Sequence, residues 1–261
     1  MKYINNKKVE KIVLNKDNFY VAIDFDRTIT SRASMDSWAA SGLTLGEDFQ
    51  KGLDKLYQYY APIELDYSLS LNEKEKHMQE WYEKCMDLYF DYDLTQDKLL
   101  ESIRNSTLEF REGAKELLNK LHENNIPVII LSAGIGNVIK QFLINNNCLF
   151  ENMYIISNFM EFEDNGEMKK YDNSKIIHTL NKNMDGHLPF DWREKIKNRK
   201  YKVLAGDLVE DIKMIDSKFE NETIKIGILD KNVEQNLKVF NENFDVVLTD
   251  EDINLNNIIK I

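Results

Sequence analysis

Short apolar runs recur along the chain, once near its start and five times from its middle onward, and they predict the strands of a sheet. The runs lie at residues 19–24, 126–131, 154–157, 201–205, 223–228 and 244–248. They are continuous rather than alternating with polar residues, which is typical of parallel strands covered on both faces. Helix-like segments separate the later runs, at residues 112–123, 137–145 and 208–218. This alternation predicts an α/β protein whose core is a doubly wound, Rossmann-like parallel sheet.

The alternation is interrupted after the first predicted strand. Helical patterns, with no further strand, cover residues 46–60, 72–92 and 96–104. The middle helix has one apolar face with helical spacing, formed by Met78, Trp81, Tyr82, Cys85 and Tyr89. It opens with Ser70 and Glu73, which match a capping box. We expect residues 32–105 to form a helical cap inserted after the first strand, and residues 1–31 and 106–261 to form the core.

The composition narrows the class of protein. Of 261 residues, 45 are acidic and 34 basic, which gives a net charge of −11. This charge opposes binding to nucleic-acid polymers and anionic membranes, but one cation in a pocket can still attract a small anionic substrate. Two cysteines form neither a disulfide framework nor a metal knuckle, which indicates a reducing compartment. With no apolar run near the roughly 18 residues of a membrane span, we expect a cytoplasmic, monomeric protein.

The first candidate site follows the first predicted strand and contains Asp24, Asp26 and Thr28. The carboxyl ends of parallel strands form the ligand crevice of such sheets. Two aspartates two residues apart on an extended segment point to the same side, and they repel each other unless a cation or a shared proton intervenes. The pair therefore indicates Mg²⁺, which prefers oxygen ligands. An acidic turn without a metal remains the alternative.

Two further candidates also follow predicted strands. Ser132 and Ala133 precede a predicted helix, where exposed backbone N–H groups can bind a phosphate. A turn that simply requires small residues is the alternative. Asp207 stands at the tip of another strand with Asp211 four residues later, so their carboxylates could complete a Mg²⁺ shell. Helix capping by these residues is the alternative.

These three motifs, in this order and each after a strand, resemble the haloacid dehalogenase superfamily of phosphohydrolases. Further segments resemble one of its families, the cytosolic pyrimidine 5′-nucleotidases (cytosolic 5′-nucleotidase III). They are Glu64–Asp66, Glu80–Tyr82, Ser132–Gly136, Ser157–Met160, Asn181–Lys182 and Gly206–Asp207. The resemblance covers about residues 18–250, including the cap, and is weakest over residues 30–56.

The resemblance implies Mg²⁺-dependent hydrolysis of nucleoside 5′-monophosphates, with pyrimidines and CMP favoured, through an aspartyl-phosphate. Asp24 would be the nucleophile, and Asp26 would protonate the leaving oxygen and then deprotonate the attacking water. The metal would be held by the Asp24 carboxylate, the Asp26 backbone carbonyl and Asp207. The phosphate oxygens would be contacted by Thr28, Ser132 and the Ala133 backbone.

The catalytic lysine of the family follows an asparagine, which matches Lys182 here. Lys175 competes by spacing, because residues seven apart on a helix face the same way. We choose Lys182, oriented by Asp211, and interpret Lys175 as a solvated surface residue.

In the cap, the resemblance implies that Glu64 binds the base and that Tyr82 stacks on it. Cys85 and Met86 stand where family members carry serine and histidine, so the wall near the base differs. Packing in the cap core is the alternative for the helix that carries Tyr82 and Cys85. A carboxylate accepts hydrogen bonds from the amino group of cytosine, whereas uracil offers only N3–H. We therefore expect CMP to be preferred over UMP, with 7-methylguanosine monophosphate as a further substrate.

Other functions compete with this interpretation. A phosphatase of the same superfamily could act on another small phosphomonoester, such as phosphoserine or a sugar phosphate. Dehalogenase or P-type ATPase chemistry is disfavoured, since Asp26 supplies the acid/base that ester hydrolysis requires. A non-catalytic binding module is disfavoured because Asp24, Lys182 and Asp207 are also all present.

Overall fold

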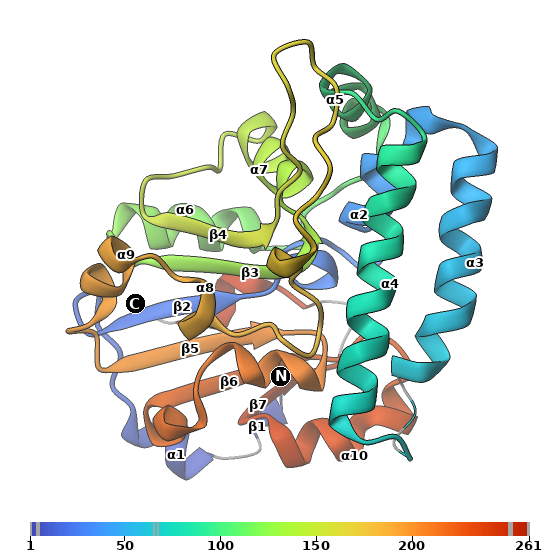
Figure 1. Ribbon diagram of the computed structural model, residues 1–261. Coiled ribbons are helices and arrows are strands. Elements are labelled where there is room, and N and C mark those ends of the chain that lie inside the picture. The colour runs from blue at the N-terminus through green and yellow to red at the C-terminus, as the bar shows by residue number, and fades with distance from the viewer. Residues whose placement is uncertain (1, 4–5, 65, 67, 250–252, 260–261) are drawn as a thin grey trace.

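The computed structural model describes residues 2–3, 6–64, 66, 68–249 and 253–259 (Figure 1). In this part of the chain seven strands form one sheet in the order β1-β7-β6-β5-β2-β3-β4. All neighbours pair in parallel except β1, which is antiparallel to β7. The strands are β1 (Lys2–Tyr3), β2 (Phe19–Ile23), β3 (Val128–Ile135), β4 (Met153–Asn158), β5 (Tyr201–Gly206), β6 (Thr223–Ile228) and β7 (Val246–Leu248). The predicted doubly wound α/β core is confirmed.

Helices cover both faces of this sheet. The helices are α1 (Asn6–Lys11), α2 (Ser37–Ser41), α3 (Glu47–Glu64), α4 (Leu71–Asp91), α5 (Gln96–Asn105), α6 (Ala114–Glu123), α7 (Gly136–Asn145), α8 (Met184–His187), α9 (Phe190–Ile196) and α10 (Val233–Asn243). Because side chains alternate along a strand, Val21 and Ile23 of β2 pack with α6 and α7, whereas Tyr20 and Ala22 pack with α8, α9 and α10. All five residues of β2 are buried, which explains the continuous apolar runs.

One expected helix is wrong, and the helical spacing considered for Lys175 and Lys182 is not realised, because side-chain hydrogen bonds hold that segment in another conformation. After a single 3-10 turn (Asn173–Lys175), the chain is extended at Ile176. The Asn158 side chain then accepts from the Ile177 N–H and donates to its carbonyl, and Asn181 accepts from the His178 N–H. These bonds replace a helical ladder, so Lys175 and Lys182 do not share a helix face. The helix expected over residues 208–218 is two 3-10 segments, Val209–Met214 and Ser217–Glu222, separated by extended backbone at Ile215.

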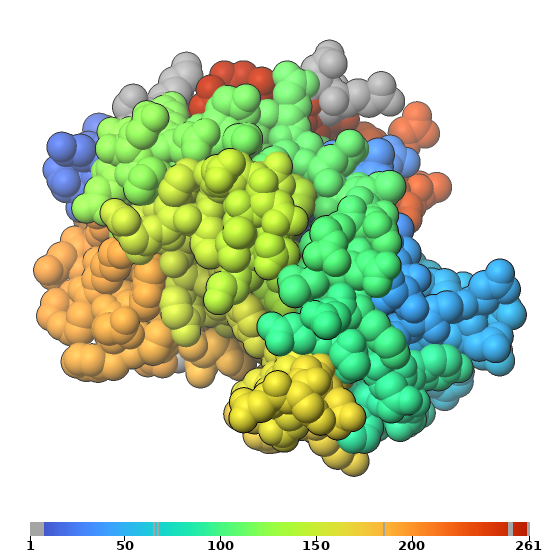
Figure 2. All heavy atoms as spheres, turned by 90° about the horizontal axis from the view of Figure 1, so that it is seen from above, coloured from blue at the N-terminus to red at the C-terminus, as the bar shows by residue number. Residues whose placement is uncertain are grey.

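The inserted helices stand at the carboxyl edge of the sheet, to which the arrowheads of the strands point in Figure 1. Helices α3 and α4 run side by side there, and the predicted capping box of α4 is confirmed: the Ser70 hydroxyl accepts from the Glu73 N–H and the Glu73 carboxylate from the Ser70 N–H. Chain outside the insertion also packs here. Met160 and Met168 share an apolar cluster with α4 and α5, and Figure 2 shows this yellow segment beside the green helices.

Candidate active site

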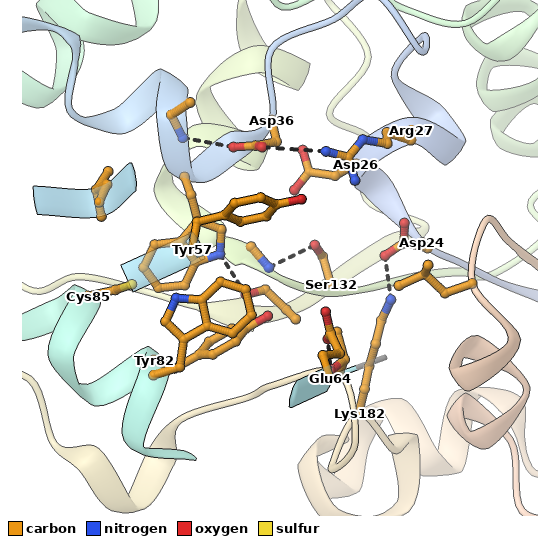
Figure 3. Close-up of a pocket in the computed structure, with 18 of the residues that line it drawn as sticks. Asp24, Asp26, Arg27, Asp36, Tyr57, Glu64, Tyr82, Cys85, Ser132 and Lys182 are labelled. Atoms are coloured by element: carbon orange, nitrogen blue, oxygen red, sulfur yellow. Dashed lines mark hydrogen bonds and ion pairs between the residues drawn. The ribbon is translucent and has the colours of Figure 1, made fainter. Parts of the chain in front are cut away.

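A cavity of about 410 Å³ opens between the carboxyl edge of the sheet and the inserted helices (Figure 3). Immediately after β2 the chain makes a π-helical turn (Phe25–Ile29), and Arg27 adopts a left-handed conformation with φ 60°. This turn places both Asp24 and Asp26 in the cavity lining. Asp24 is buried, and its backbone N–H donates to the Ala205 carbonyl of β5, which fixes it at the strand tip.

Lys182 joins two of the carboxylates at the floor of the cavity. Its ammonium is hydrogen-bonded to Asp24 Oδ1 and, at 2.7 Å, to Asp211 Oδ1, and all three side chains are buried. Burial disfavours the ammonium, but Asp211 and Asp24 outweigh it and raise the pKa of Lys182. Lys175 lies elsewhere: its side chain is 68% exposed and pairs with Asp172. The structure therefore places Lys182, and not Lys175, beside Asp24.

The carboxylates of Asp24, Asp207 and Asp211 each place an oxygen within 4.8 Å of the others. Burial raises the pKa of Asp24 to about 6, against the lowering effect of Lys182, and burial together with Asp24 raises the pKa of Asp207 well above its usual range. Asp211 already accepts from Lys182 and, at 3.0 Å, from the Leu208 N–H. Both oxygens of Asp211 are thus engaged, whereas Lys182 engages only Oδ1 of Asp24. Asp24 and Asp207 remain to face a cation, and this all-oxygen, mutually repelling donor set fits Mg²⁺.

The carboxylate of Asp26 is turned away from this cluster toward helix α2. Its Oδ1 accepts from the Ser37 N–H at 2.8 Å, and its Oδ2 accepts from the Ser37 hydroxyl at 2.6 Å. Burial, with a contribution from Asp36, raises the pKa of Asp26 to about 7. A carboxyl group with this pKa can both give and take a proton near neutrality. Its side chain is not part of the cluster formed by Asp24, Asp207 and Asp211.

The last residues of β3, after its register shift at Leu131, form the side of the cavity next to Asp26. Ser132 lines it, with its hydroxyl accepting from the Gly134 N–H at 3.0 Å, and Ala133 lines it as well. Thr28 is not among the described residues of the lining. Thr28 is fully buried, and its hydroxyl has no hydrogen-bond partner among the described residues. The expected phosphate contact of Thr28 stays a prediction.

Glu64 and Tyr82, for which the sequence analysis expects contact with the base, also line the cavity. Glu64 ends α3; its carboxylate accepts from the Thr179 hydroxyl at 2.7 Å, and burial raises its pKa. Leu65, in the middle of the cap motif, lies outside the described residues. The Tyr82 ring meets Trp38 edge-on, with centroids 5.3 Å apart, and Trp81 at 5.7 Å. The aromatic wall is therefore a packed group of rings rather than a single one.

Of the two positions where α4 departs from the family pattern, only one reaches the cavity. Cys85 lines it, and burial raises the pKa of its thiol to about 12, so the group is a neutral wall. Met86 is buried in the apolar cluster with Phe49 and Tyr89. Met86 is therefore not among the described residues that line the cavity.

Several lining residues carry polar or aromatic groups that the sequence motifs did not identify. They are Arg27, Asp36, Trp38, Gln50, Asp54, Tyr57 and Thr179. Four come from residues 30–56, where the family resemblance is weakest. A local signal exists for Asp36, which caps α2 by accepting from the Ala39 N–H, because aspartate two residues before an apolar helical stretch is a start signal.

Among the described helices none is long and apolar enough to cross a membrane.

The family of the chain follows from its similarity to known proteins. Residues 20–260 match the family described as pyrimidine 5′-nucleotidase (UMPH-1). The chain belongs to this family. The pyrimidine 5′-nucleotidases are phosphoric monoester hydrolases that act on 5′-nucleotides, which agrees with the family and the enzyme class inferred from the motifs.

Individual relatives in this 5′-nucleotidase family are similar over most of the chain. The 7-methylguanosine phosphate-specific 5′-nucleotidase of Mus musculus is 30% identical over 240 residues, which are 89% of this chain and 80% of that protein. Form A from Xenopus laevis is 33% identical over 206 residues, 78% of this chain and 70% of that protein. A crystal structure of cytosolic 5′-nucleotidase IIIB bound to cytidine superimposes with a TM-score of 0.79 at 30% identity, covering 95% of this chain and 85% of that one.

Phosphoserine phosphatase, in a substrate-bound structure, shares the fold at 18% identity with a TM-score of 0.56, covering 92% of this chain and 96% of that one. At this identity the likeness concerns the fold of haloacid dehalogenase-type hydrolases alone.

Proposed function

We propose that this protein hydrolyses pyrimidine nucleoside 5′-monophosphates to nucleoside and phosphate with Mg²⁺, in the cytoplasm and as a monomer. The observation that carries the proposal is a single cavity whose lining combines a proposed phosphate site, Asp24, Asp26 and Lys182, with a proposed base site, Glu64 and Tyr82. A nucleotide combines the matching groups, a phosphate and a flat base. Its partner is this small molecule rather than a nucleic-acid polymer or a membrane.

The proposed reaction has two steps. In the first, an Asp24 carboxylate oxygen attacks phosphorus, the bond from phosphorus to the 5′-oxygen breaks, and Asp26 gives its proton to that oxygen. In the second, Asp26 takes a proton from water as the water attacks the aspartyl-phosphate, which releases phosphate and restores Asp24. Lys182, held by Asp211, places a positive charge beside the nucleophile, where it reduces repulsion between carboxylate and phosphate.

The acidic cluster would hold the metal through Asp24, Asp207 and the Asp26 backbone carbonyl. When bound, Mg²⁺ neutralises negative charge on the transferring phosphoryl group. Ser132 and the Ala133 backbone lie on the same side of the cavity and would bind phosphate oxygens.

The base would be read by the cap, which we assign to residues 32–105, with the phosphate chemistry assigned to residues 1–31 and 106–261. Three carboxylates, Asp36, Asp54 and Glu64, face the cavity, so its wall favours groups that donate hydrogen bonds or carry positive charge. Cytosine offers an amino group, whereas the carbonyl oxygens of uracil are repelled. CMP is therefore preferred over UMP, and the cationic base of 7-methylguanosine monophosphate is a further substrate. The names of the relatives and the cytidine-bound structure support this range.

Phosphate release from a panel of esters tests this function. CMP, UMP, 7-methylguanosine monophosphate, phosphoserine and a sugar phosphate are compared at equal concentration, with Mg²⁺ and again with EDTA. We expect the nucleotides to have the highest kcat/KM, CMP to exceed UMP, and EDTA to abolish turnover. A preference for phosphoserine or the sugar phosphate would replace the proposed substrate class, and full activity in EDTA would contradict the metal-dependent mechanism.

A further inference from the structure

Ser37, a buried serine in the inserted segment, is hydrogen-bonded to Asp26, the proposed acid/base. Ser37 opens α2, is fully buried, and places a hydrogen on each oxygen of the Asp26 carboxylate, from its N–H at 2.8 Å and from its hydroxyl at 2.6 Å. Two donors from one residue fix both the direction of the carboxylate and its rotation. No sequence motif identified Ser37, because it lies in the stretch where the family resemblance is weakest.

The Ser37 hydroxyl is itself oriented by the sheet. It accepts from the Ile135 N–H at 3.1 Å, so its own hydrogen is directed at Asp26. A Cβ added at Gly134 would lie 2.0 Å from the Ser37 hydroxyl oxygen and 2.7 Å from Asp26 Oδ2. The lack of a side chain at Gly134 is thus what lets Ser37 and Asp26 approach the end of β3, which carries Ser132.

A second hydrogen bond connects the start of α2 to the same end of β3. The Trp38 indole N–H donates to the Ala133 carbonyl at 3.2 Å. The serine is therefore held between the turn after β2 and the end of β3, and its position is set by both. We propose that Ser37 is a positioning residue that aims the carboxyl group of Asp26 at the leaving oxygen of the substrate, an inference that rests on the proposed phosphohydrolase function.

A misaimed acid harms the reaction only when the leaving group needs a proton. An alkoxide such as the 5′-oxygen of a nucleoside is strongly basic and must be protonated as the phosphorus–oxygen bond breaks, whereas p-nitrophenolate leaves readily without a proton. The value of kcat/KM covers the steps up to departure of this group. A loss of positioning should therefore grow with the basicity of the leaving group, while a loss of structure should affect all substrates alike.

The experiment measures kcat/KM with Mg²⁺ for a series of aryl phosphates of rising leaving-group basicity and for CMP. Ser37→Ala removes the hydroxyl, Ser37→Cys keeps the volume with a weaker donor, and Ser41→Ala is the matched control, a fully buried serine of the same helix that bonds Trp38 and Tyr89 instead. Since a positioned acid is worth about 10²–10⁴ in rate, both Ser37 variants should lose roughly ten- to a hundredfold on CMP and less than about threefold on p-nitrophenyl phosphate.

Three results would overturn the inference, because each would mean that Ser37 does not act through the acid. They are equal losses of kcat/KM across the series, no loss in either variant, and failure of both variants to fold. Ser41→Ala should match the unmodified enzyme throughout. If the unmodified enzyme cleaves aryl phosphates but not nucleotides, the proposed substrate is wrong, and the slope of the aryl series still decides the role of Ser37.

Discussion

The proposed phosphate site and the proposed base site of the cavity are built from different interactions. At the phosphate site, charged hydrogen bonds connect the buried residues Lys182, Asp24 and Asp211. At the base site, Glu64 is held by one hydroxyl of a loop, and the Tyr82 ring by edge-on contacts with other rings. Charge pairs buried together tolerate little change, whereas packed rings can be exchanged at lower cost. We therefore expect substitutions at the phosphate site to abolish catalysis, and substitutions at the base site to change which base is preferred.

The largest effect is expected at the nucleophile. Asp24→Asn removes the attacking oxygen but keeps the size of the side chain, and turnover of CMP should fall by at least about 10³-fold, as for other nucleophile substitutions. CMP binding, measured by calorimetry, should persist because the base wall is unchanged. Turnover close to that of the unmodified enzyme would remove Asp24 from the mechanism.

The next effect concerns the lysine. Lys182→Ala leaves the carboxylates of Asp24 and Asp211 buried without their cation, and breaking such a network costs about 3–5 kcal/mol of folding free energy. Thermal unfolding should shift downward and kcat should fall at least about a hundredfold. Lys175→Ala is the control: its exposed side chain pairs with Asp172, and such surface pairs contribute about 0–1 kcal/mol. The reverse ranking would show that Lys175 is the catalytic lysine.

A smaller and more selective effect is expected at Glu64. A charge-assisted hydrogen bond is worth about 1.5–3 kcal/mol, so Glu64→Ala should lower kcat/KM for CMP by roughly 10–100-fold and spare p-nitrophenyl phosphate, which has no base. Glu64→Gln adds an amide donor and should raise the ratio of UMP to CMP hydrolysis. Equal losses on both substrates in Glu64→Ala would place Glu64 in the support of the fold instead.

The smallest effect is expected at Cys85. Its thiol is a neutral part of the cavity wall, so Cys85→Ser introduces a stronger hydrogen-bonding group and should change the CMP to UMP ratio by about two- to fivefold. Activity on p-nitrophenyl phosphate should stay constant. Cys148→Ser is the matched control, because Cys148 is buried in the core cluster of the sheet and does not line the cavity. An equal change in the CMP to UMP ratio for both variants would indicate a general loss of packing in the fold instead of a change in the cavity wall.

The contrast between the two sites also explains what the sequence could predict. Asp24, Ser132 and Asp207 follow apolar strands, and parallel topology brings such strand ends to one edge, so local pattern alone places them. Ser37 and Arg27 could not be found this way, since their roles depend on a left-handed turn and on contacts across the chain. The helical spacing considered for Lys175 and Lys182 is not realised, because Asn158 from β4 and Asn181 within the segment accept hydrogen bonds from its backbone. A contact such as that of Asn158, which joins two separate segments, leaves no periodic signal.

The central claim is that one nucleotide spans both sites, with its phosphate at Asp24 and its base at Glu64. A crystal structure of the enzyme with cytidine, Mg²⁺ and fluoroaluminate, a mimic of the transferring phosphoryl group, tests it most directly. The account predicts the mimic between Asp24 and the 5′-oxygen, close to Ser132, with the cytosine amino group within hydrogen-bond distance of the Glu64 carboxylate. A mimic bound away from Asp24, or a base turned away from Glu64 toward solvent, would contradict it.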